Sequence, residues 1–418
     1  MGKQLPKKKP CSIFPSAKKG KTRLLLKKNF TKKPVGANAK TKLWQKTPYV
    51  QNGIVLRMDR MRWKRNLKDF LNKDENHMVK ILTEDGLLPD WSKMKCPFCN
   101  TSAVSPLQKR DNLPPRYRCR SRHCHKFILP HYLHPVFTSR NGSEGHSLSV
   151  QGSALLMRLA GVPLSSIHIL LDMNHKALER MEKNLAFVRK AYVEHCQKSM
   201  SFGTGKGKKW TEVEADEAVF DKFLLPAEDA EVQKKPMRWE QWLGMVARGK
   251  PSSLVLIRLP STATCKRAPG PGAVKKESWL KIANTWLKNR NIILHTDSAR
   301  SYKAKIAGVL QDSVVHQKKR VWKGGKYVWK PPTFVRLVKH KLPDGRKITL
   351  KAGTQVVDRA WRYIKDRIKQ NQHVKSNSTL IQAKVRSAQY EYWHRGKDAW
   401  MSTGELFTWY MNTIAAKL

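Results

Sequence analysis

Acidic side chains are scarce in this sequence. Asp and Glu together number 31 against 83 Lys and Arg, which gives a formal net charge of +52 over 418 residues. Such an excess of positive charge repels itself unless a polyanion neutralises it, so nucleic acid is the expected partner. Hydrophobic residues still make up 40% of the chain and include 14 Trp, which excludes a fully disordered basic protein. A chain of this length predicts roughly two or three domains.

Long apolar runs are absent as well. No stretch approaches the roughly 18 consecutive apolar residues that a transmembrane helix needs, so we expect a soluble protein without a membrane partner. The N-terminus lacks the continuous apolar core of a secretory signal. Pro6 stands where an N-myristoylation signal requires Ser or Thr. We therefore expect neither secretion nor a lipid anchor.

Residues 1–50 contain no acidic side chain but carry 15 Lys or Arg. This composition cannot bury enough apolar surface to fold alone and predicts a solvated basic arm. The run Lys7–Lys9, flanked by prolines, is compatible with a nuclear localisation signal, and we expect the protein in the nucleus. A nonspecific charged tail and an organelle transit peptide are the alternatives. Residues 51–92 place apolar side chains at helical spacing, which predicts amphipathic helices that pack on a core.

Cysteines are few, and their number, 7, is odd, which argues against a disulfide framework. Two close pairs separated by 19 residues have the pattern of a zinc ribbon, predicted over residues 93–137, and consist of Cys96, Cys99, Cys119 and Cys124. Four thiolates leave no open position on a zinc ion, so the predicted role is structural. There are two alternatives: His123 or His125 replaces one of the thiolates as a zinc ligand, or the thiols are buried and bind no metal. The many arginines between residues 116 and 126 suit phosphate contacts.

Residues 147–200 predict helices separated by a short turn at Gly161-Val162-Pro163. A helix, a glycine-containing turn and a second helix of this size resemble a helix-turn-helix, which predicts a DNA-binding segment. A plain helical hairpin whose leucines pack a core fits the same pattern. The Gly- and Lys-rich residues 201–209 read as a linker.

Residues 210–372 predict an α/β domain with two notable acids. Strands are expected at 211–220, 242–247, 254–257 and 292–294, with a helix at 277–287 before the last of them. Glu214 and Asp216 share one face of the first strand, and like charges on one face repel unless a cation lies between them. Asp297 directly follows the last strand, where open sheets place their chemistry at the carboxyl ends of parallel strands.

A third acid is expected on a helix that begins near residue 353. Its apolar stripe at helical spacing indicates packing on a core and consists of Val357, Trp361, Ile364 and Ile368. Asp358 lies beside this stripe, with Lys365 two turns further along the same side. An i,i+4 ion pair with Arg362 is the alternative for Asp358, and a solvated ion pair is the expected role of Asp366.

Four groups of residues follow one another along the chain: Glu214-x-Asp216-Glu217, the strand-turn-strand 242–259, His295-Thr296-Asp297-Ser298-x-x-x-Tyr302, and Gly353-Thr354-Gln355-x-x-Asp358-x-x-Trp361-x-x-x-Lys365. In order and spacing they resemble the DDE-type transposases of the Merlin group and their bacterial insertion-sequence relatives. The resemblance covers roughly residues 90 to 370. It implies a ribonuclease-H-like mixed sheet with flanking helices, preceded by a zinc ribbon and a helical DNA-binding segment.

The same resemblance assigns roles to individual residues. It implies that Asp216, Asp297 and Asp358 are catalytic acids that hold two Mg²⁺ or Mn²⁺ ions, and that Lys365 contacts a phosphate. The expected function is a DNA transposase that cleaves and joins strands as a homo-oligomer on transposon ends and target DNA. Two features depart from the family: the third acid is Asp where Glu or Asn is common, and residues 321–334 form a Trp-rich basic insertion.

Two other functions share this composition. One is a domesticated, catalytically inactive nucleic-acid-binding protein, and the other is a structural basic protein of an organelle ribosome. Between Gln317 and Lys351, aromatic residues alternate with cations, which suits stacking on unpaired bases, while a solvated β-hairpin is the plain alternative. Residues 373–418 predict a helical tail that packs on the catalytic domain.

Overall fold

The computed structural model describes residues 63–110, 113–138, 145–205, 207, 209–225, 234–368 and 379–415. All of them belong to one compact unit that spans Lys46–Leu418. The predicted basic arm at residues 1–50, its Lys7–Lys9 signal and residues 51–62 of the predicted helices lie outside the described residues. Within the described part of the chain, no helix is both long and apolar enough to cross a membrane.

The first described region combines short helices with two small strands. Its elements are the 3-10 helices Leu67–Asp69 and Trp91–Lys93, helix α2 (Glu75–Glu84), and strands β1 (Tyr117–Arg118) and β2 (Phe127–Ile128). Helix α2 begins where the side chain of Asp74 accepts a hydrogen bond from the backbone N–H of His77, and it buries Met78 and Leu82. The region therefore contributes to the core by the apolar face that the spacing of residues 51–92 predicts.

Three helices follow, α3 (Leu148–Leu159), α4 (Leu164–Leu171) and α5 (His175–Ser199). Ser147 caps α3, and Asn174 caps α5. Gly161, in the turn before α4, has φ +89°, a conformation that glycine adopts without strain. The predicted helices and glycine turn are thus present, with α5 much longer than the two before it.

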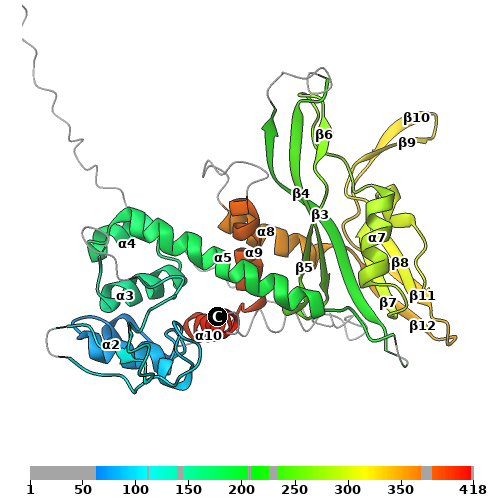
Figure 1. Ribbon diagram of the computed structural model, residues 1–418. Helices are drawn as coiled ribbons and strands as arrows, with labels where there is room; N and C mark the ends of the chain where they lie inside the picture. Colours follow the sequence, from blue (N-terminus) through cyan, green and yellow to red (C-terminus); the bar gives the residue numbers. More distant parts are fainter. Residues whose placement is uncertain are drawn as a thin grey trace, which may run out of the picture. The chain divides into compact units, whose positions relative to one another are not determined.

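The largest sheet among the described residues is mixed and six-stranded, and it lies to the right of α5 in Figure 1. Its strands are β3 (Thr211–Leu224), β4 (Met237–Ala247), β5 (Val255–Arg258), β6 (Thr262–Thr264), β7 (Ile292–Asp297) and β8 (Val309–Val314). The order is β5-β4-β3-β7-β8, with β6 also paired to β4. Strand β4 is antiparallel to β3 and β5, whereas β3, β7 and β8 run parallel.

Helices cover both faces of this sheet. Helix α7 (Lys276–Trp286) lies on one face, where Trp279 packs with Val213 and Leu294. Helices α8 (Gln355–Arg367) and α9 (Thr379–Trp393) lie on the other, together with α5. The predicted α/β class, with a mixed sheet and flanking helices, is confirmed.

Two β-hairpins occupy the chain between β8 and α8. The first pairs β9 (Lys319–Lys323) with β10 (Lys326–Lys330), and the second pairs β11 (Arg336–Lys341) with β12 (Lys347–Ala352). Both are separate two-stranded sheets. The alternating basic and aromatic residues of this region therefore lie on strands that do not join the central sheet.

The C-terminal helices are part of the core. Helix α9 lies along α5, where Arg386 donates a 2.9 Å hydrogen bond to Oε1 of Gln197. Helix α10 (Ala399–Ala415) follows and buries Trp400 and Phe407 in the same apolar cluster. The predicted tail at residues 373–418 is thus helical over its described part, and it packs against both the sheet and the helical segment before it.

Candidate functional site

Strands β3 and β7 place two of the predicted acids side by side. The parallel ladder pairs Glu214 with His295, and Asp216 and Asp297 each lie two residues further along their strands. Residues two apart on a strand point to the same face, so these two aspartates are level with each other on one side of the sheet. Asp297 ends β7, and its Oδ1 accepts a 2.9 Å hydrogen bond from the backbone N–H of Ala299.

Helix α8 brings the third acid to this face. Asp216 pairs with Gly244 of β4, and a Cβ at Gly244 would lie 2.5 Å from Cζ2 of Trp361. The missing side chain therefore lets the Trp361 indole lie directly on the strand opposite Asp216. Asp358 precedes Trp361 by one helical turn, which places it over the same part of the sheet.

Glu214 holds the start of α8. Its side chain is 1% exposed, and Oε2 accepts hydrogen bonds from the backbone N–H of Val356 at 2.6 Å and of Val357 at 3.0 Å. A carboxylate at this position accepts hydrogen bonds from free N–H groups of the first helical turn and is attracted by the positive end of the helix dipole. The guanidinium of Arg248 lies beside Glu214 and donates to Oε1 at 2.7 Å, while the cation expected between Glu214 and Asp216 stays a prediction.

Arg248 ties the same helix to the turn after β4. It donates to the backbone carbonyls of Lys351 at 2.6 Å and Gly353 at 2.9 Å, the residues that lead into α8. Arg248 also bonds Glu212 at 2.7 Å. Because one guanidinium fixes two carboxylates and two carbonyls, the position of Asp358 relative to Asp216 depends on Arg248.

The charges around Asp216 are unfavourable to its ionised form. Burial, followed by the negative charges of Glu217, Asp358 and Asp297, raises the pKa of Asp216 to about 8. Burial also raises the pKa of Asp358. The hydroxyl of Thr354 donates a 3.2 Å hydrogen bond to Oδ2 of Asp358, which offsets part of this rise. Asp297 and Asp358 are therefore close enough to raise the pKa of Asp216, and a bound cation would relieve this repulsion.

The spacing of these carboxylates limits how they could hold metal. Among the described residues, one group of side chains has all its ligand atoms within 4.8 Å, and it is the cysteine cluster rather than the aspartates. The ligand atoms of one Mg²⁺ lie about 2.1 Å from the ion, so three ligand atoms of a single ion would lie within 4.8 Å of one another. Two ions about 3.5 to 4 Å apart, with one carboxylate between them, allow the outer oxygens to be roughly 8 Å apart. The wide spacing is thus compatible with two ions.

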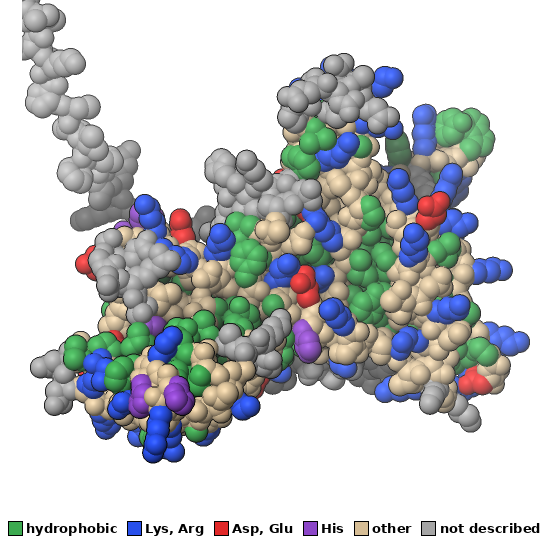
Figure 2. Space-filling view, in the orientation of Figure 1, with side chains coloured by type: hydrophobic (Ala, Val, Ile, Leu, Met, Phe, Trp, Pro, Cys, Tyr) green, Lys and Arg blue, Asp and Glu red, His purple; other side chains and the backbone are tan. Residues whose placement is uncertain are grey.

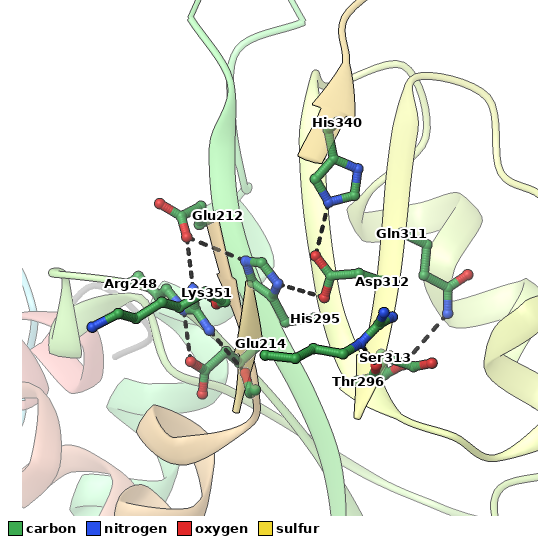
Figure 3. Close-up of polar contacts among 12 residues, drawn as sticks. Glu212, Glu214, Arg248, His295, Thr296, Gln311, Asp312, Ser313, His340 and Lys351 are labelled. Atoms are coloured by element: carbon green, nitrogen blue, oxygen red, sulfur yellow. Dashed lines mark hydrogen bonds and ion pairs between the residues drawn. The ribbon is translucent and has the colours of Figure 1, made fainter. Parts of the chain in front are cut away.

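A polar network lies beside the acids, and sequence reasoning missed it (Figure 3). His295 shares a 2.7 Å contact with Asp312 through Nδ1 and a 3.2 Å contact with Glu212 through Nε2. His340 of β11 reaches the other oxygen of Asp312 at 2.8 Å. Burial lowers the pKa of His295, but the hydrogen bonds with Asp312 and Glu212 raise it more. The network joins β3, β7, β8 and β11, and its one sequence signal was the alternation of acids along β3 at Glu212, Glu214 and Asp216.

Two further side chains lie near the acids: His316 contacts the start of α8, and Lys365 lies on α8 itself. His316 Nε2 lies 3.3 Å from Oγ1 of Thr354, the hydroxyl that donates to Asp358. Lys365 is exposed on α8, two turns after Asp358. Lys365 thus lies on the side of the helix that the sequence predicts.

The four predicted cysteines form a compact cluster. Sγ of Cys96 lies 3.8 Å from Sγ of Cys124, and Sγ of Cys99 lies 3.7 Å from Sγ of Cys119. Thiolates at about 2.3 Å from a zinc ion, at the corners of a tetrahedron, are about 3.8 Å apart. The cluster could therefore bind a metal ion such as zinc.

The turns around the cysteines support the same interpretation. Asn100 and His125 have φ of 51° and 47°, which turns the chain tightly just after Cys99 and Cys124. The backbone N–H of Ser121 donates to Sγ of Cys119 at 3.4 Å, as donors around ligating sulfur do. His125 instead bonds Arg118 at 3.2 Å, and neither it nor His123 belongs to the cluster.

Comparison of the chain with protein-family models, with curated proteins and with solved structures finds no match.

Proposed function

We propose that this protein is a DNA transposase that cleaves and joins DNA strands with divalent metal ions. One observation carries the proposal: Asp216, Asp297 and Asp358 come from β3, β7 and α8, yet the charges of Asp358 and Asp297 reach Asp216 and raise its pKa. Carboxylates gathered at one point of a chain with net charge +52 indicate a cation site rather than chance. A mixed sheet with acids on two adjacent parallel strands and on a flanking helix supports a ribonuclease-H-like fold.

Carboxylate oxygens are the ligands that Mg²⁺ and Mn²⁺ prefer, and the raised pKa of Asp216 fits a site that completes its charge balance with a cation. Two such ions supply activation of the attacking oxygen and stabilisation of the leaving oxygen in phosphodiester chemistry. Asp216, Asp297 and Asp358 are the residues that would hold the ions. Glu214 and Arg248 hold α8, and Lys365 binds a phosphate of the DNA.

The surface suits a DNA partner. Figure 2 shows Lys and Arg side chains spread over the visible face, with few Asp or Glu among them. Such a surface attracts the phosphate backbone and makes binding strongly dependent on salt. The cysteine cluster is proposed as a structural zinc site of the DNA-binding part, where exposed Arg118 and Arg120 are available for phosphate contacts.

The test is strand cleavage and joining on DNA that carries the gene's own flanking ends, with Mg²⁺, Mn²⁺ or EDTA. We expect metal-dependent activity in the wild type and its loss in Asp297→Ala, with duplex affinity changed by less than about threefold because the substitution removes none of the Lys and Arg side chains that bind phosphate. Asp366→Ala, an exposed aspartate on α8, is the matched control and should keep activity. Activity that survives in Asp297→Ala, or is lost equally in Asp366→Ala, would contradict the proposal.

A noncatalytic nucleic-acid-binding protein is the second candidate. It is favoured by the spacing of the three aspartates, whose oxygens do not fall within 4.8 Å of one another. This candidate expects tight DNA binding without cleavage under any metal, and no gain in thermal stability when Mn²⁺ is added. Stabilisation by Mn²⁺ that disappears in Asp216→Asn would exclude it.

A further inference from the structure

Hairpin β9–β10 carries an exposed surface that the acids do not account for. Trp322, Tyr327 and Trp329 are 63%, 59% and 64% exposed, although soluble proteins rarely leave neighbouring large aromatics in water without a function. Figure 1 shows the hairpin extending beyond β8 and α7. A two-stranded hairpin of this kind has little stability of its own, so a binding partner explains why its aromatic side chains are kept outside.

The strand register divides the hairpin into two different faces. Trp322 pairs with Tyr327, and Arg320 pairs with Trp329, so these four side chains share one face. The rings of Trp322 and Tyr327 are 4.7 Å apart, and the Arg320 guanidinium lies 4.3 Å from the Tyr327 ring centre. The opposite face presents exposed Lys323, Lys326 and Lys330 around the Val321–Val328 pair. One face is therefore aromatic and the other is cationic.

The chemistry of the two faces selects the partner. Residues 316–343 contain no Asp or Glu, so the partner is anionic. Aromatic and guanidinium planes stack on the faces of bases, which are accessible only where the bases are unpaired, while lysines neutralise the adjoining phosphates. An apolar protein surface would not need the lysine face.

The base of the hairpin lies beside the acids. Asp297 pairs with Val314 in the sheet, and the next residue, Val315, bridges to Thr333 where the hairpin returns. His316 then contacts Thr354, which bonds Asp358. Strands of five residues reach about 17 Å from that base, so DNA held at the acids passes within reach of the aromatic face.

We propose that the β9–β10 hairpin binds unpaired DNA bases next to the cleavage point by stacking on Trp322 and Trp329. The inference rests on the proposed function, because it names the form of DNA that this site takes. It assigns to the hairpin a preference for frayed or single-stranded DNA over intact duplex.

The experiment uses the full chain with two probes, a blunt duplex and the same duplex with an unpaired extension that carries 2-aminopurine. Trp322→Ala combined with Trp329→Ala should weaken binding of the extended probe at least about tenfold and remove the change in 2-aminopurine fluorescence, since each stacked base contributes substantially to affinity. Affinity for the blunt duplex should change less than about twofold. Trp322→Phe combined with Trp329→Phe should keep most of the effect, and Leu337→Ala, 64% exposed on the next hairpin, is the matched control.

A second measurement needs no substitution. With 5-iodouracil in the unpaired extension, photocrosslinks to the wild-type chain should map to residues 320–329. Equal weakening of both probes in the alanine variant, no weakening, or crosslinks confined to other segments would overturn the inference. The two proposals fail separately: binding of the extension without any cleavage contradicts only the transposase, and cleavage with unchanged binding in the alanine variant contradicts only the hairpin.

Discussion

Gly244 is a single residue on which the position of α8 depends. Its backbone lies under the Trp361 ring, so a Cβ there would meet the indole at 2.5 Å. We expect Gly244→Ala to lower the free energy of unfolding by about 1 to 3 kcal/mol, the usual cost of overpacking a core, and to reduce cleavage as α8 shifts Asp358. Chemical denaturation and the cleavage assay measure the two effects.

Gly270→Ala is the matched control for this substitution, because a Cβ at Gly270 meets no atom within 4 Å. If Gly244→Ala and the control have equal unfolding free energies, the packing of Trp361 does not require glycine at position 244.

Asp85 predicts a dependence of stability on pH. Burial raises the pKa of Asp85, but hydrogen bonds from Arg65, Lys64 and Trp400 lower it below its usual value. A carboxyl with a lowered pKa stabilises the fold above the unfolded-state pKa of about 3.9, and this contribution is lost as pH falls through the lower folded value. Asp85→Asn should therefore be less stable by about 3 kcal/mol at pH 7, where it removes the buried partner of Arg65 and leaves that cation only the longer 3.8 Å contact with Glu84, and closer to wild type below pH of about 3.

Urea titrations at both pH values measure this difference. The exposed Asp366 provides the control, since Asp366→Asn should stay within about 0.5 kcal/mol of wild type throughout. A deficit of Asp85→Asn that is the same at low and neutral pH would exclude the assigned role of the carboxylate.

At the scale of elements, the two turns that carry the cysteines are expected to need a bound metal ion to stay folded. Cys96 and Cys119 are buried in a small cluster with Trp91, Tyr117 and Ile128, which is too small to be stable without a further link. Zinc removal by a chelator, or Cys96→Ser with Cys99→Ser, should unfold this region and weaken duplex binding about tenfold or more, because metal binding and folding are coupled in such sites.

Zinc content by mass spectrometry and amide hydrogen exchange over residues 93–137 measure this effect. His123→Ala and His125→Ala are the controls, and both should keep the metal because neither histidine belongs to the thiol cluster. Full affinity for DNA after the metal is gone would separate the cluster from binding.

For the molecule as a whole, the C-terminal helices decide whether the sheet is stable. Gln389 and Trp393 of α9 donate to the carbonyl of Leu254 at 2.8 and 2.7 Å, and Arg386 donates to that of Leu256 at 2.9 Å. Deleting residues 379–418 should remove these donors, leave the Leu254 carbonyl without its side-chain partners and expose the apolar face of the sheet. We expect the shortened chain to be insoluble or unfolded by circular dichroism.

Deletion of residues 1–45, which lie outside the described residues, is the control and should leave the thermal unfolding midpoint of the remainder unchanged. A soluble, folded protein that ends at residue 378 would show that α9 and α10 are an independent tail.

Local patterns in the sequence were sufficient for much of the fold. Alternation and helical spacing report which face of a segment is buried, so strands β3, β5 and β7 and helices α5, α7 and α8 could be expected from a few residues each. The cysteine pairs were equally local in the sequence, with two or four residues between the members of a pair, whereas the 3.7 and 3.8 Å thiol contacts join one pair to the other. The α/β class and the cysteine cluster follow from such signals alone.

The candidate site could be predicted only in part. Asp216, Asp297 and Asp358 were selected because each has a recognisable place on its own strand or helix. Glu214 seemed to be a further acid of the same face, and its hydrogen bonds to Val356 and Val357 join residues more than 140 positions apart. No periodic pattern reports a contact over that distance, so its role in holding α8 emerged from the structure.

The sequence by itself determined the charge of this protein, the type of its elements and the cysteine cluster, because composition, periodicity and short-range turns depend on neighbouring residues. Tertiary structure decided what those elements do together. It placed Arg248 between Glu214 and the start of α8, joined His295, Asp312 and His340 into one network, and made α9 part of the core. These contacts depend on the register of strands and the packing of helices, which follow from the balance of the whole chain rather than from any segment of it.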